Sequence, residues 1–287
     1  MRPAASLAAY FELTKPGITL YVMITAGVSA AVASAGHPGV LTTIHAVLGT
    51  GLATGGALAL NQYVEREADA VMSRTRGRPL PSGRLRPPQA LAFGALLLVA
   101  GLAYLSVAGG WTAAGLAALS AVAYLAVYTP LKRRSYAATL AGAVPGAMPV
   151  LIGWSAATGS IGVGAFALFA IAYLWQLPHV LGLAWMLRAD YERVGFKLMP
   201  QGGARQIGTH MVVATLALVP VSVTPTLLGL TGRWYFGGAL AASLALVAVA
   251  VGTARDMSEA GARKLFLASL LYHPVLLALM ALDTVRT

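Results

Sequence analysis

The chain has 287 residues, of which 58% are hydrophobic and only 10% are charged. A soluble domain carries roughly 25% charged residues, so the composition excludes an ordinary soluble protein. The net charge of +11 would suit a nucleic-acid-binding protein. The charges are separated by long apolar runs, however, so we attribute the excess of basic residues to membrane topology and expect no nucleic-acid partner. The sequence has no cysteine, which excludes disulfides and thiol chemistry.

The N-terminal segment "MRPAASLAAYFELTKPG" is not expected to be a cleaved signal sequence. Glu12, Lys15 and Pro16 interrupt it where a secretory apolar core would lie. Residues 4–13 are instead predicted to form a short helix at the membrane surface, which leads into the first span.

Nine apolar runs follow along the chain, each of about the 20 residues that cross a bilayer as a helix. Their centres lie near residues 26, 52, 98, 120, 147, 174, 219, 244 and 273. Strands of a membrane β-barrel would be about 10 residues long and would alternate in polarity, and these runs do neither. We therefore predict an all-α integral membrane protein with nine transmembrane helices and a single domain over residues 1–287.

The charged residues fall mostly on one side of this predicted bundle. The N-terminus and the segments after spans 2, 4, 6 and 8 hold 18 of the 20 basic residues, and only Arg233 and Arg286 lie on the other side. The positive-inside rule makes the charged side cytoplasmic, with the N-terminus inside and the C-terminus outside. Eight of the nine acidic residues share that side, and the rule does not explain them because acids contribute little to it.

Three polar residues at the end of the second span share one helix face. Asn61, Glu65 and Asp69 are spaced i, i+4 and i+8, which aligns them on a helix. Like charges at this spacing repel, and a divalent cation would remove the repulsion. Mg²⁺ prefers oxygen ligands and is typically held by one or two carboxylates together with a substrate phosphate. The spacing therefore predicts a magnesium site.

An arginine-rich loop, "SRTRGRPLPSGR", follows these acids. Guanidinium groups pair well with phosphate oxygens, so acids and arginines together predict a diphosphate pocket. The alternative is that the arginines pair with the acids or face lipid headgroups. Asn61 favours the pocket, because an amide lying deeper in the span usually marks function.

At these residues the chain resembles the UbiA superfamily of intramembrane prenyltransferases. "NQYVEREADAVMSRTRGRPLPSGR" is similar to the first acidic motif of that superfamily, and its continuation is similar to the haem-farnesylating branch. "ELTKPGIT", "YTPLKRRS", "GAVPGAMPVLIGWSAATG" and "WQLPHVLGLAWMLRADYERVGFKLMP" resemble four further motifs of that branch in the same order. The first motif departs from the superfamily in having Glu65 for an aspartate. The second acidic motif is reduced, because Ala189 and Val194 stand at acidic positions.

The resemblance implies a UbiA-type helix bundle whose active site opens to the cytoplasmic face. It implies a prenyltransferase that moves the farnesyl group of farnesyl diphosphate to a vinyl carbon of protohaem IX (haem b), giving haem O, with Mg²⁺ as cofactor and haem as substrate. It also implies that the protein lies in the bacterial inner membrane. A haem A synthase, which would consume the product, is a further partner that the resemblance suggests.

The resemblance carries roles onto particular residues. Glu65 and Asp69 would bind one Mg²⁺, Asp190 a second with help from Glu192, and Asn61 would fix the diphosphate or a metal-bound water. The remaining substrate contacts would come from cations that hold diphosphate or a haem propionate, namely Arg74, Arg78, Lys132 and Arg133. The basic triplet 132–134 after a span is also an ordinary topological signal.

Three further residues have two interpretations each. Tyr128 and Tyr191 would shield an allylic cation with their ring faces or belong to the aromatic belt at the membrane surface. His179 would ligate haem iron or bond a carbonyl freed by Pro178.

Two other functions compete with this reading. A related prenyltransferase would act on another lipophilic aromatic acceptor such as a quinone precursor, through the same acidic site. A transporter would couple ions through intramembrane carboxylates, but those usually lie near the bilayer midplane, whereas here the acids cluster at one face.

Overall fold

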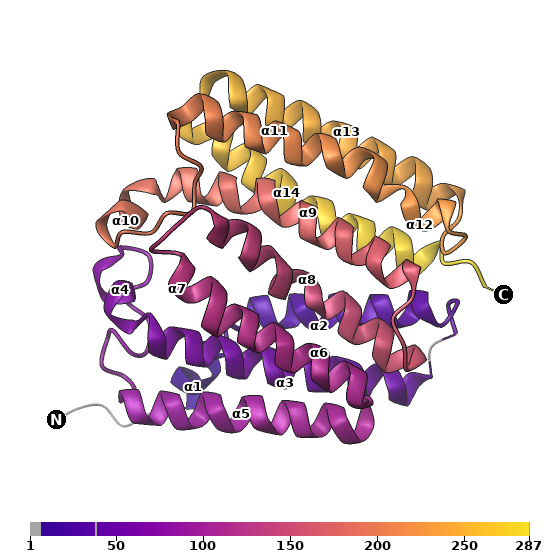
Figure 1. The fold of residues 1–287 in the computed structure, drawn as a ribbon, viewed down its shortest axis with the longest axis horizontal. Coiled ribbons are helices and arrows are strands. Elements are labelled where there is room, and N and C mark those ends of the chain that lie inside the picture. The colour runs from indigo at the N-terminus through magenta and orange to yellow at the C-terminus, as the bar shows by residue number, and fades with distance from the viewer. Residues whose placement is uncertain (1–6, 38, 287) are drawn as a thin grey trace.

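The computed structural model describes residues 7–37 and 39–286, and within them nine helices are long and apolar enough to cross a membrane. The prediction of nine spans is confirmed for this part of the chain (Figure 1). The spans are α2 (Pro16–Ala33), α3 (Val40–Val64), α5 (Pro87–Ala108), α6 with η1 and α7 (Trp111–Val122, Ala123–Tyr128, Thr129–Leu131), α8 (Ala137–Thr158), α9 (Val163–Met186), α11 with α12 (Gly203–Ser222, Thr224–Leu227), α13 (Arg233–Asp256) and α14 (Glu259–Leu282).

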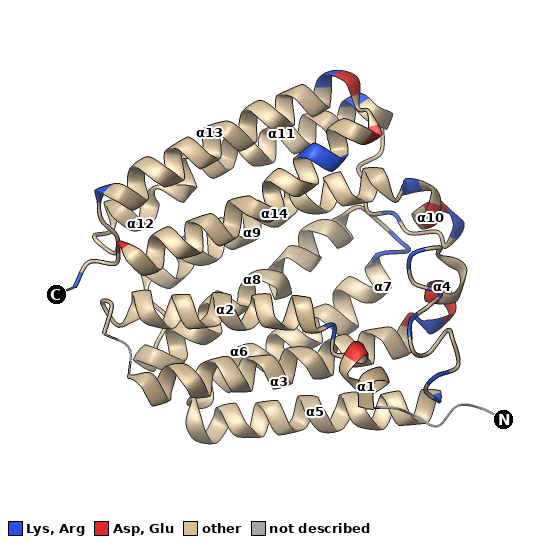
Figure 2. Cartoon of the chain, turned by 180° about the vertical axis from the view of Figure 1, so that it is seen from behind, with Lys and Arg blue, Asp and Glu red and all other residues tan. Residues whose placement is uncertain are grey.

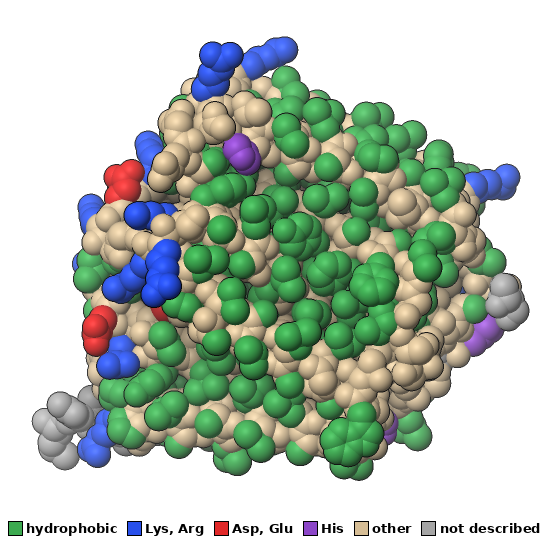
Figure 3. Space-filling model, viewed as in Figure 1, with side chains coloured by type: hydrophobic (Ala, Val, Ile, Leu, Met, Phe, Trp, Pro, Cys, Tyr) green, Lys and Arg blue, Asp and Glu red, His purple; other side chains and the backbone are tan. Residues whose placement is uncertain are grey.

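Short elements close one end of the bundle. Helix α4 (Arg66–Val71) follows α3, and α10 (Arg188–Arg193) follows α9. Lys, Arg, Asp and Glu gather at the end that carries α4 and α10, which we call the charged end (Figure 2). The broad face between the two ends is covered by hydrophobic side chains (Figure 3), as expected of a surface in contact with lipid. The protein is a multi-pass membrane protein.

Helix α1 (Leu7–Leu13) lies at the charged end beside α3 and α5. It buries Ala9 and Leu13 and exposes Leu7 and Phe11, so its apolar residues lie on two sides rather than one. This agrees with the predicted short helix over residues 4–13, of which residues 4–6 lie outside the described part of the chain.

Small residues let neighbouring helices approach closely, which drives helix association in lipid. A Cβ at Gly56 of α3 would meet the backbone of Leu98 in α5, and a Cβ at Gly101 of α5 would meet the backbone of Ala53. Helix α3 therefore packs on α5 at two positions where only glycine fits.

Helix α8 contains two prolines and repairs one of the hydrogen bonds that they break. Pro149 has no N–H to donate to the carbonyl of Pro145 four residues earlier. Ser120 of α6 donates to that carbonyl instead, at 3.2 Å. The repair bonds α6 to α8 and satisfies a backbone group that could find no water in the membrane.

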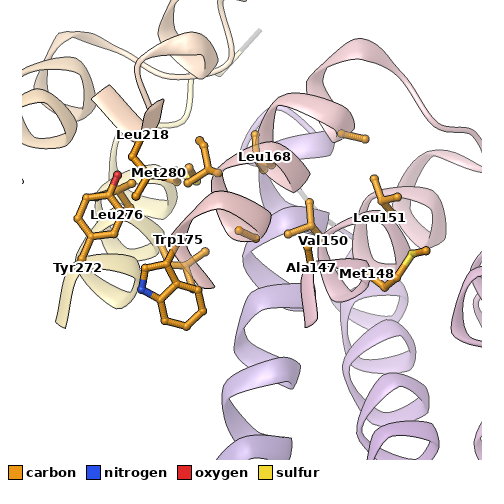
Figure 4. Packing of buried hydrophobic residues seen from close by; sticks show 14 of the residues in the cluster. Ala147, Met148, Val150, Leu151, Leu168, Trp175, Leu218, Tyr272, Leu276 and Met280 are labelled. Carbon is orange, nitrogen blue, oxygen red and sulfur yellow. The ribbon is translucent and has the colours of Figure 1, made fainter. Parts of the chain in front are cut away.

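The core runs through α8, α9, α11, α13 and α14 (Figure 4). Trp175 of α9 stacks on His273 of α14 with ring centroids 4.6 Å apart. Leu168, Leu218 and Leu276 are buried in the same hydrophobic cluster as Trp175. This packing fixes α9, and with it the position of α10 at the charged end.

Candidate active site

The helix that carries Asn61, Glu65 and Asp69 is interrupted at Glu65, but the three residues keep their helical spacing. Helix α3 ends at Val64, and α4 starts at Arg66. The backbone N–H of Glu65 still donates to the carbonyl of Asn61 at 2.9 Å, and that of Asp69 to the carbonyl of Glu65 at 2.8 Å. The i, i+4 spacing is therefore kept across the break. Asn61 and Asp69 are each only 1% exposed.

Glu65 contacts a cation from a distant part of the chain, and Asp69 contacts one from the loop that follows it. Lys132 donates to both oxygens of Glu65 at 2.7 and 3.0 Å, and these side chains are 9% and 10% exposed. One nitrogen of Arg78 donates to both oxygens of Asp69 at 2.7 Å. Burial opposes the charge of Lys132, but Tyr128 and Glu65 outweigh it and raise the pKa of this amine.

Asn61 links this cluster to two other elements. Its amide nitrogen donates to the hydroxyl of Thr129 at 3.1 Å, and its amide oxygen lies 3.5 Å from the amine of Lys15. Lys15 was not among the predicted site residues. The signal that points to it is the motif "ELTKPGIT", in which it precedes Pro16, the first residue of α2.

The second acidic motif faces the first across the charged end. Asp190 of α10 accepts from the hydroxyl of Ser73, just beyond α4, at 3.2 Å and from Arg193 at 3.3 Å. Tyr191 is buried in a cluster with Met72 and half-buried Tyr128, and burial raises the pKa of its hydroxyl. The two motifs are thus in contact through Ser73.

The other predicted cations lie further out. Arg74 and Arg133 are exposed. Arg84 forms an ion pair with Glu12 of α1 at 2.6 Å, which connects the arginine-rich loop to α1.

An apolar cavity of about 250 Å³ lies below the cluster, between α2, α3, α6, η1, α8 and α9. Tyr128 lines it, and the amine of Lys132 lies 4.4 Å from the centre of the Tyr128 ring. Tyr124, which was not among the predicted site residues, also lines the cavity and stacks on Tyr128 with ring centroids 5.6 Å apart. Both belong to the π-helical turn η1, a distortion that is frequent at functional sites. The tyrosines therefore lie between the charged cluster and an oily chamber.

His179 does not line this cavity. Its Nδ1 is 3.0 Å from the hydroxyl of Ser269, and its ring stacks on Trp175 and Phe266 with centroids 5.2 and 4.8 Å apart. These contacts place the imidazole between α9 and α14, where it bonds Ser269 rather than a carbonyl freed by Pro178. The role of His179 as a haem ligand stays a prediction.

The residues present fit a magnesium ion that is shared with a substrate. Among the described residues no group of three or more His, Cys, Asp or Glu gathers as a metal site. Two carboxylates, Glu65 and Asp69, do lie one turn apart, and Mg²⁺ sites commonly take one or two carboxylates and complete their shell with phosphate and water. The donor set is therefore suited to a metal that arrives with a diphosphate.

The sequence profile of the UbiA prenyltransferase family matches residues 22–272. A protoheme IX farnesyltransferase of Solibacter usitatus is 41% identical over 96% of this chain and 98% of its own length. A protein of the same name from Koribacter versatilis is 39% identical over 98% of this chain and 94% of its own length.

Solved structures share the fold at low identity. A structure of digeranylgeranylglyceryl phosphate synthase superposes with a TM-score of 0.81 at 17% identity, covering 96% of this chain and 98% of that one. A UbiA homologue from Archaeoglobus fulgidus bound to GPP and Mg²⁺ superposes with a TM-score of 0.64 at 12% identity, covering 95% and 99%. With a family profile over most of its length and close relatives along nearly all of it, this chain belongs to the UbiA prenyltransferase family.

Proposed function

We propose that this prenyltransferase moves the farnesyl group of farnesyl diphosphate to a vinyl carbon of protohaem IX, producing haem O. The acceptor is supported by relatives named protoheme IX farnesyltransferase at 41% and 39% identity over nearly the whole chain. It is supported as well by the haem-branch continuation of the first acidic motif.

One observation carries the reaction class. A cluster of buried carboxylates and cations caps an apolar cavity, which suits a molecule with an anionic head and a hydrocarbon tail. The diphosphate would lie among Arg78, Lys132 and Asn61, and the isoprenoid would lie against Tyr124 and Tyr128.

The chemical step needs charge stabilisation at the head and dryness at the tail. Breaking the C–O bond leaves negative charge on the diphosphate, and positioned cations such as Lys132 and Arg78 stabilise that charge. When bound through Glu65 and Asp69, Mg²⁺ would supply Lewis-acid stabilisation to the same leaving group. Asp190 of α10 would contribute to the binding of a second metal ion.

The allylic carbon becomes cationic as the bond breaks, and the ring faces of Tyr124 and Tyr128 would stabilise it. Tyr191, which lies at the charged end, would shield the allylic cation from that side. The apolar cavity would keep bulk water away from the allylic cation, so the vinyl group of the acceptor attacks that cation before water does. The new cation beside the haem ring would then take up one water molecule and lose a proton, which gives the hydroxyl of the product. The exposed Arg74 and Arg133 would receive a haem propionate.

The proposed setting is the bacterial inner membrane, with the charged end and N-terminus in the cytoplasm and the C-terminus outside. The positive-inside rule supports this orientation, because 18 of the 20 basic residues lie on that side. A haem A synthase that takes up the product is the proposed partner.

The test uses purified protein with haem b, farnesyl diphosphate and Mg²⁺, and mass spectrometry of the haem. The expected product carries one farnesyl group and one added water. A parallel reaction contains a quinone precursor in place of haem. If haem stays unchanged while the quinone precursor is farnesylated, the acceptor is another aromatic compound and the haem proposal is rejected.

A further inference from the structure

Lys15 occupies an unusual backbone position at the charged end. It lies between α1 and α2, with φ 47° and ψ 66°, in the left-handed region. A non-glycine residue there is strained, and such strain persists only where the surroundings hold it. Here Pro16 begins α2 directly afterwards, and the Lys15 side chain is half-buried.

The amine of Lys15 points into the charged cluster. It lies 3.5 Å from the amide oxygen of Asn61. Burial, together with the charges of Arg78 and Lys132, lowers the pKa of Lys15 to about 7, while Glu65 and Asp69 act in the opposite direction. The structure thus holds a third cation beside two others.

The three cations differ in their partners. Arg78 pairs with Asp69 and Lys132 pairs with Glu65, whereas Lys15 takes part in none of the ion pairs among residues 7–37 and 39–286. Three cations and two carboxylates leave one positive charge without a counterion. Because Lys15 has no acidic partner among these residues, its amine is available to donate to an anion that enters the cluster.

We propose that Lys15 is a further substrate-binding residue, whose ammonium group donates to the diphosphate of the isoprenyl substrate beside Asn61. This inference rests on the proposed prenyl transfer and adds a residue to it. As the bond between C1 and oxygen breaks, its electron pair stays on the diphosphate, and Lys15 stabilises that charge without giving up a proton. Lys15 thereby acts on the same diphosphate as Arg78 and Lys132.

The direct test is the affinity of the purified protein for inorganic pyrophosphate with Mg²⁺, measured by calorimetry. Lys15→Met should weaken binding about 10- to 100-fold, as expected for loss of a hydrogen bond from a charged donor. Lys15→Arg should stay within about threefold of wild type, because the charge remains. Lys264→Met, at an exposed position of α14, is the matched control and should change nothing.

A second readout separates binding from a merely structural role. Below pH 7 the Lys15 amine is charged, and above it the amine loses its proton, so the affinity of the wild type relative to that of Lys15→Arg should fall as pH rises from 6 to 8.5. The charged groups that face it are Arg78, Lys132, Glu65 and Asp69. Lys15→Arg is the reference, since arginine stays protonated throughout. If Lys15→Met does not fold, the comparison of wild type with Lys15→Arg decides.

The outcomes separate the two proposals. Wild-type affinity in Lys15→Met, or an identical pH profile in Lys15→Arg, would overturn the assignment of Lys15 while leaving haem farnesylation in place. Lysine-dependent pyrophosphate binding in a protein that never farnesylates haem would reject the acceptor and support Lys15.

Discussion

Replacing Lys132 with methionine tests whether the charged cluster is a coupled unit. The amine donates to both oxygens of Glu65, and the two side chains are 9% and 10% exposed. Removing one partner of a buried ion pair leaves the other uncompensated and costs about 3–5 kcal/mol. We expect Lys132→Met to lose about that much stability, and Lys132→Met with Glu65→Gln to recover most of it.

The assay is denaturant or thermal unfolding of purified protein in one detergent, with prenyl transfer measured on the same samples. The double variant should be stable and inactive, because neutral side chains restore the packing but not the diphosphate or metal contacts. Lys197→Met, at an exposed lysine, is the control and should change stability by less than about 0.5 kcal/mol. Equal losses in Lys132→Met and Lys197→Met would refute the reasoning.

Three other predictions follow from the site and the cavity. Asp69→Ala should lower kcat at least about 100-fold without reducing the amount of protein in membranes; wild-type turnover would remove the proposed metal site. Thr50→Val should stabilise the fold by about 1 kcal/mol, because the buried Thr50 hydroxyl has no partner among the described residues, whereas Thr215→Val should destabilise it by a similar amount through loss of a 3.1 Å bond to Met211. Thermal unfolding that shifts both variants the same way would contradict this. Ala117→Phe should fill the cavity that Ala117 lines and shift the kcat/KM ratio of geranyl to farnesyl diphosphate at least about tenfold, and an unchanged ratio would place the isoprenoid elsewhere.

The sequence alone determined the spans and the acidic line, because both depend on local spacing. A run of about 20 apolar residues must bond its backbone internally in lipid, and a helix does so whatever its neighbours are. The line of Asn61, Glu65 and Asp69 survived even the break at Glu65, since the backbone bonds four residues apart continue through it. The reaction was inferred from the similarity of five sequence motifs to those of a known enzyme family.

Only the tertiary structure decided which cation meets which acid. Lys132 reaches Glu65 across 67 residues of sequence, and no periodicity predicts a contact at that separation. The same is true of Lys15, which sequence spacing leaves at the start of a span and the fold brings to Asn61. Long-range pairs depend on how helices pack, and that packing is set by small residues such as Gly56 and Gly101, which let two backbones come close enough to fix the bundle.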